Sequence, residues 1–310
     1  MAVAGEGRKR QESSVGHSGA DSALWTDVSE VLNGERTLWR AAERLVALAL
    51  PHVEQTCVDL PLTMELNVDV VSRSIVRRAH DSLTAVTVAV NSPARASARV
   101  HLRAMAEDLI FVSWLCLLDK TVATEYLKRS ARVEALRTVE AQLKFLPLAY
   151  HELATPLPEL ELLDPTDALV QARHELANLC RAQGWGKRGP SVRNMAVAAG
   201  LLPEYEFFYF LSSKAVHANL HEIARMVWGN EHTLKISSDP FVGVHADLAV
   251  VYGVWLFDKA LGALANMFRP IEQLLKKQAY SIWLAMILVG AARNGKLPLL
   301  IHPEELGRRL

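Results

Sequence analysis

Apolar residues recur every three or four positions along most of this chain, and this pattern is what most constrains its fold. From Trp25 onward the apolar positions follow one helix face after another, and Pro or Gly residues separate the successive runs. No alternating pattern long enough to predict a substantial strand is present. Because amphipathic helices must cover one another's apolar faces, the sequence predicts an all-α fold, a multi-helix bundle with peripheral helices.

The beginning of the chain lacks this pattern. Residues 1–22 are rich in Gly, Ser and charged side chains, so we expect them to form a disordered N-terminal tail. Residues 23–310 should form one helical domain, since 50% of the chain is hydrophobic and can supply a large core. Within that domain we expect a central part at about residues 94–228 and apolar C-terminal helices at 242–293.

Helix ends are predicted from Pro and Gly residues and from breaks in the apolar spacing. Pro51 should end an early helix. The later helices are expected at Pro93–Asp119, Glu204–Trp228, Val242–Leu275 and Gln278–Arg293.

Charge and cysteine content exclude several classes of protein. Lys and Arg together number 34, as do Asp and Glu, so the chain lacks the basic excess typical of nucleic-acid-binding proteins. The three cysteines contain no C-x-x-C pair and fit a reducing cytoplasm. The apolar stretch Ala279–Ala292 is shorter than the roughly 20 residues that span a bilayer, so no membrane association is expected.

Polar side chains line one face of the helix expected at residues 93–119. Arg99, Arg103 and Glu107 follow at intervals of four, so they should share a stripe. The stripe is either a solvated face with ordinary ion pairs or an Arg–Glu pair drawn into the bundle.

A second polar stripe runs along the helix expected at residues 204–228. Tyr209, Ser213, His217 and His221 recur every four residues, and Ser212 lies beside them. The row is either a hydrogen-bonded network that fixes helix packing or part of a site completed by Arg103 or Glu107 from the other helix.

The histidine spacing also permits a weaker possibility. His217 and His221 are one helical turn apart, a spacing that can hold a metal ion when further ligands converge. Nothing else in the sequence demands a metal or a cofactor, and we expect none.

The two stripes together resemble an uncharacterised bacterial all-helical family, one of the domain-of-unknown-function groups. The residues that carry the resemblance are Arg103, Glu107, Tyr209, Ser212 and Val216-His217. The layout is also similar to the HEPN superfamily, whose helical bundles occur in toxins, abortive-infection systems and RNA-processing proteins. That resemblance implies a dimer in which Arg and His act on RNA. In this chain serines replace the expected Arg before His217, whereas the run Arg95-Ala96-Ser97-Ala98-Arg99-Val100-His101 fits the Arg-x-His count.

Three functions follow as hypotheses. The first is a non-catalytic helical protein of a bacterial defence or stress system that binds a protein partner or a small ligand. The second is a HEPN-like, metal-independent ribonuclease, and the third is a metal-dependent helical-bundle enzyme built on His217, His221 and Glu107. Whether the protein is an enzyme stays open, and the long apolar helices predict a homodimer.

Candidate roles can be assigned within the two stripes. His217 would exchange protons near neutral pH, Arg103 would hold an anionic group, and Glu107 would orient either of them. Ligand-binding positions are expected at Arg99, Tyr209, Ser212 and Ser213.

Overall fold

The computed structural model describes residues 18–33, 36–58, 66–153, 165–187, 189–216, 227–229, 234–236 and 242–293. These residues form an all-α protein, with one pair of three-residue strands as the exception. The elements are α1 (Ser18–Asn33), α2 (Thr37–Cys57), α3 (Val68–Val90), the short 3-10 helix η1 (Arg95–Arg99), α4 (Val100–Leu115), α5 (Lys120–Leu153), α6 (Thr166–Ala182), α7 (Val192–Ala199), α8 (Leu202–Val216), β1 (Val227–Gly229), β2 (Leu234–Ile236), α10 (Val242–Leu264), α11 (Arg269–Leu275) and α12 (Gln278–Arg293). Strands β1 and β2 pair antiparallel, with Val227 opposite Ile236.

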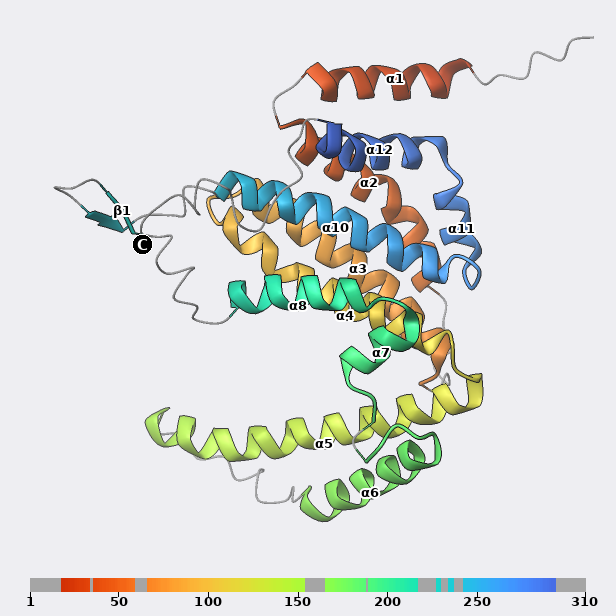
Figure 1. Cartoon of the computed structure of the whole chain (residues 1–310), viewed down its shortest axis with the longest axis vertical. Helices are drawn as coiled ribbons and strands as arrows, with labels where there is room; N and C mark the ends of the chain where they lie inside the picture. The colour runs from red at the N-terminus through yellow and green to blue at the C-terminus, as the bar shows by residue number, and fades with distance from the viewer. Residues whose placement is uncertain are drawn as a thin grey trace, which may run out of the picture.

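Helix α10 is the central element of the bundle. It packs against α2, α3, α4 and η1, and it runs across the middle of the bundle in Figure 1. At Gly253 the helix lies close to two neighbours, because a Cβ added there would lie 3.4 Å from Leu83 on α3 and 3.6 Å from Leu102 on α4. The apolar residues of α10 are therefore covered largely within the chain itself, and pairing across a homodimer stays a prediction.

Peripheral helices lie at both ends of this bundle. In Figure 1, α1 lies beyond α2 and α12 at one end, and α5 with α6 lies at the other. Three aromatic rings join α5 and α6 to α4. The ring of Trp114 on α4 lies 5.2 Å from that of Tyr126 on α5 and 5.2 Å from that of Trp185, which follows α6. The predicted core with peripheral helices is confirmed.

The predicted helix end at Pro51 is wrong, because α2 continues to Cys57. Pro51 is exposed, whereas His52 and Val53 beside it are buried. A proline frees one backbone carbonyl four residues earlier, here that of Ala47, also an exposed residue. Water can bond to that carbonyl while the buried face of α2 stays packed, so the helix survives.

Three other helix boundaries differ from those predicted. The helix expected at 242–275 is divided: α10 ends at Leu264 and α11 begins at Arg269, with Pro270 in its first turn, where a helix does not need the N–H that proline lacks. The helix expected at 93–119 begins as η1 and becomes α-helical only at Val100. Trp228, the expected end of another helix, lies in β1. Helix α12 has the predicted bounds.

The structure describes only part of the segment that was predicted to be an N-terminal tail. Helix α1 begins at Ser18, inside the segment expected to be a tail, and residues 1–17 lie outside the described part of the chain. Among the described helices, none combines the length and hydropathy that a membrane crossing requires.

Candidate functional site

Helix α4 holds the first polar pair predicted from the sequence. The Nε of Arg103 donates a hydrogen bond to Oε1 of Glu107 at 2.8 Å, one turn along the helix. This hydrogen bond raises the pKa of Arg103 above its usual value, so the guanidinium is always charged. Both side chains are partly exposed.

Helix α8 brings an aromatic residue onto this pair. The guanidinium carbon of Arg103 lies 5.0 Å from the ring centroid of Tyr209, a cation–π contact, and Tyr205 stacks on Tyr209 at 5.3 Å. The two helices that carry the predicted stripes therefore meet at Arg103, Glu107 and Tyr209. The space left among these side chains is about 10 Å³, at the lower limit of what one water molecule needs. These residues bind one another and leave no room there for a ligand.

The other predicted positions do not join this cluster in the described structure. Arg99 belongs to η1, before α4 begins, and only 5% of its surface is exposed, so it does not continue the partly exposed stripe of Arg103 and Glu107. Ser212 and Ser213 lie in the last turns of α8, and their side chains are outside the described part of the structure. His217 and His221 lie outside the described residues altogether. Over the described residues, no group of three or more His, Cys, Asp or Glu side chains could hold a metal ion.

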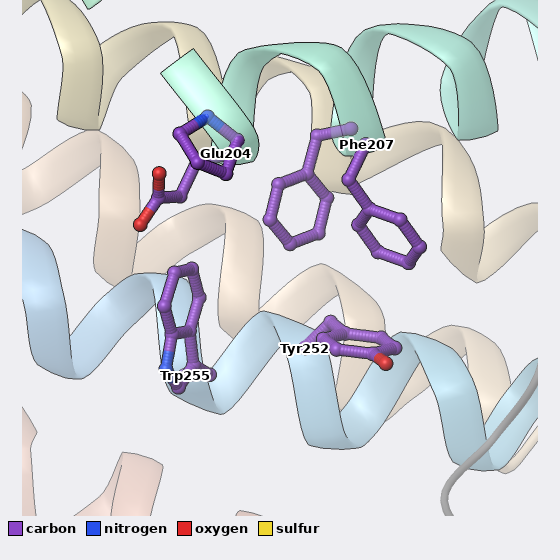
Figure 2. Close-up of a pocket in the computed structure, with 6 residues that line it drawn as sticks. Glu204, Phe207, Tyr252 and Trp255 are labelled. Carbon is purple, nitrogen blue, oxygen red and sulfur yellow. The ribbon is translucent and has the colours of Figure 1, made fainter. Parts of the chain in front are cut away.

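A larger hollow lies between α8 and α10, and we call it the α8–α10 groove. Its volume is about 300 Å³. Six residues line it: Pro203, Glu204, Phe207, Phe208, Tyr252 and Trp255. Figure 2 shows Glu204 and Phe207 on α8 facing Trp255 and Tyr252 on α10. The groove is therefore built from two helices that are distant in the sequence.

Contacts between aromatic rings of α8 and α10 determine the shape of the groove. Phe207 lies 5.1 Å from Tyr252, and Phe208 lies 5.8 Å from Tyr252 and 6.0 Å from Trp255. Phe208 is only 2% exposed, whereas Phe207 is 37% exposed. Phe208 thus anchors α8 to α10, while Phe207 remains available at the edge of the groove. Aromatic pairs at such distances add stability beyond the area they bury.

Glu204 is the one acidic side chain of the groove, in the first turn of α8. Its Oε2 atom is inaccessible to water and has no hydrogen-bond partner among the described residues. Leaving a buried polar atom unsatisfied costs about 1–3 kcal/mol, and more when the group is charged. Burial also raises the pKa of Tyr252 above its usual value, so the phenol stays protonated near neutral pH.

The sequence-based search missed this groove because it followed polar residues at helical spacing. A usable signal was present: five of the six residues from Tyr205 to Phe210 are aromatic, interrupted only by Glu206. A helix this aromatic that also exposes Phe207, Tyr209 and Phe210 indicates a binding surface. The partners on α10 could not be assigned from spacing alone.

Comparison with known proteins places the chain in a family. A family model described as a family of unknown function (DUF5677) matches residues 69–233, just over half of the chain. The match includes Arg103, Glu107 and the α8 side of the groove, while α10 lies beyond it. No curated protein and no solved structure matches the chain. The expected resemblance to a domain-of-unknown-function family is thus confirmed, and the chain belongs to the DUF5677 family.

Proposed function

We propose that this protein is a non-catalytic helical module that binds a small molecule in the α8–α10 groove. The observation that carries the proposal is the groove itself, about 300 Å³ in volume and lined by four aromatic side chains, one proline and one glutamate. Small-molecule sites are typically concave, largely apolar and supplied with a few polar groups that orient the ligand. The groove meets each of these conditions.

The chemistry of the lining favours binding over catalysis. Its ionisable groups are Glu204 and Tyr252, and the raised pKa of Tyr252 keeps that hydroxyl from acting as a base near neutral pH. General acid–base catalysis needs a proton donor and an acceptor matched to the working pH, and nucleophilic catalysis needs a nucleophile beside a base. Among the residues that line the groove no nucleophile lies beside a base, and the raised pKa makes the Tyr252 hydroxyl a poor general acid.

The contacts of three arginines also favour a binding protein over a ribonuclease. Arg95 lies over the Trp39 ring at 5.6 Å, Arg99 is buried, and Arg103 is paired with Glu107. RNA binding requires cationic side chains that are free to contact phosphates. These three arginines are engaged within the protein, which makes them poor phosphate contacts.

Fluorine NMR of the full chain tests the proposal. The seven tryptophans would be replaced biosynthetically with fluorotryptophan, and the Trp255→Phe variant would assign the Trp255 signal. Small aromatic and cationic fragments should shift the Trp255 signal. The Phe207→Ala variant should bind the same fragments more weakly, because Phe207 forms the edge of the groove.

Phe210→Ala is the matched control, since Phe210 lies on the same helix, is 55% exposed and does not line the groove. Its fragment affinities should equal those of the wild type. Fragments that shift other tryptophan signals and leave that of Trp255 unchanged would place the binding site elsewhere and contradict the proposal.

A further inference from the structure

The α8–α10 groove combines two features that attract positive charge. The faces of aromatic rings carry negative electrostatic potential, and Tyr252 and Trp255 line the groove together with Phe207 and Phe208. The Oε2 atom of Glu204, inaccessible to water, has no hydrogen-bond partner among the described residues. A cation in the groove would contact the rings and neutralise this carboxylate at the same time.

The Trp255 ring is already placed to attract a cation. The Nζ atom of Lys259, one turn further along α10, lies 5.7 Å from the ring centroid. Lys259 is exposed and is not among the residues that line the groove. The Trp255 ring is therefore accessible to a cation, and the lysine does not line the groove.

The α8–α10 groove offers few hydrogen-bond acceptors, and this determines which kind of cation it can hold. A primary ammonium carries three N–H donors, and burial without acceptors leaves such donors unsatisfied. Glu204 is the one charged acceptor among the lining residues, and the other side-chain acceptor is the Tyr252 hydroxyl, since the Trp255 indole only donates. A trimethylammonium group has no N–H donors, and its methyl groups can pack against the aromatic rings. Its positive charge is also less strongly hydrated than that of a primary ammonium, so it loses less on leaving water.

We propose that the α8–α10 groove binds a small molecule that carries a trimethylammonium group, with the cation held by Glu204, Tyr252 and Trp255. This inference rests on the proposed function and specifies its ligand class. The groove volume of about 300 Å³ leaves space beside the cation for a short polar tail. The exposed edge at Phe207 provides the route of entry.

Isothermal titration calorimetry of the full chain provides the test, with choline as the probe. The comparison compound is the uncharged carbon isostere of choline, in which a tert-butyl group replaces the trimethylammonium group. Choline should bind the wild type about tenfold more tightly than the isostere, a ratio between those expected for exposed and for desolvated cation–π contacts. Equal affinities for the two compounds would overturn the proposal, because shape alone would then explain binding.

Two matched variants test the role of the carboxylate. Glu204→Gln preserves the size of the side chain and removes its charge, so it should weaken choline binding about tenfold and leave isostere binding unchanged. Glu206→Gln removes an exposed carboxylate two residues along the same helix and should change neither affinity. Thermal melts of both variants that match the wild type would establish that folding is intact. An unchanged choline affinity in a folded Glu204→Gln variant would contradict the assignment of Glu204.

The two proposals can fail separately. If the isostere binds and shifts the fluorotryptophan signal of Trp255 while choline does neither, the groove binds ligands but the cation assignment is wrong. If neither compound nor any small fragment shifts that signal, both the ligand class and the proposed function are wrong.

Discussion

The Nε atom of Arg78 lies 3.0 Å from Oδ2 of Asp108, yet burial of the carboxylate outweighs this attraction and raises the pKa of Asp108 to about 6. Arg78 is on α3 and mostly exposed, whereas Asp108 is buried on α4. The exposed arginine remains solvated by water, so it compensates for only part of the desolvation of the acid. The pair therefore makes stability depend on pH in an unusual direction.

Asp108 should lower the stability of the protein as the pH rises. An unfolded Asp has a pKa of about 4, so between about pH 4 and about pH 6 the folded state binds more protons than the unfolded state. The free energy of unfolding must then fall with rising pH across that window. Replacing the acid by Asp108→Asn should remove this contribution, which is roughly 3 kcal/mol. Urea unfolding at a series of pH values would measure it.

Asp119 supplies a control for the Asp108 experiment. Hydrogen bonds from the backbone N–H groups of Val122 and Thr121 lower the pKa of Asp119. The stability it contributes is present above the unfolded pKa and is lost as the pH falls, so Asp119→Asn should alter the pH slope in the opposite sense and at more acidic pH. Identical slopes for the wild type and Asp108→Asn would show that the buried acid does not titrate differently on folding.

A hydrogen bond between α2 and α10 should be an important contact of the core. The indole Nε1 of Trp39 donates to Oδ1 of Asp247 at 2.7 Å, and Trp39 is only 6% exposed. Trp39→Phe keeps an aromatic ring and removes the donor, so the free energy of unfolding should fall by about 2 kcal/mol. Urea unfolding would measure the loss. Trp25 on α1 is 52% exposed, so Trp25→Phe should change the free energy of unfolding little. Equal losses at the two positions would mean that the hydrogen bond between Trp39 and Asp247 does not stabilise the fold.

Gly253 should not accept a branched side chain. Valine there would press on Leu83 and Leu102 at the point where α3, α4 and α10 converge, so Gly253→Val should cost about 1–3 kcal/mol. Gly262 is on the same helix and has nothing within 4 Å of an added Cβ. Gly262→Val should therefore be close to neutral in the same denaturation experiment. Since valine favours a helix more than glycine does, a similar cost at both sites would mean that contact with Leu83 and Leu102 does not determine the effect.

The Arg103 cluster should stabilise helix packing without taking part in ligand binding. Arg103→Ala removes a partly exposed ion pair and the contact with Tyr209, so it should lower the free energy of unfolding by about 1 kcal/mol. Ligand affinity in the α8–α10 groove should not change. Loss of fragment binding in a folded Arg103→Ala variant, observed by fluorine NMR, would instead support the site originally predicted from the polar stripes.

Helix bounds were predicted well where the apolar spacing of the segment alone determined them. Helix α12 has the bounds expected from its apolar run. Pro51 and Pro270 show what the proline rule leaves undecided, since the same residue type lies inside α2 but in the first turn of α11, after a break in the helix. The difference is whether the chain around the proline is packed so that the helix can continue, and that depends on residues far away in the sequence.

The candidate site also has one part that the sequence predicted and another that depends on distant residues. Sequence spacing alone was enough to identify the pairing of Arg103 with Glu107, because residues four apart on a helix are neighbours in any fold. Its contact with Tyr209, the burial of Arg99 and the α8–α10 groove depend on which helix faces are brought together. Helical periodicity states that a face must be covered but carries no information about the element that covers it. The all-α class was therefore determined by the sequence pattern, whereas the position, shape and chemistry of the groove were decided by tertiary packing.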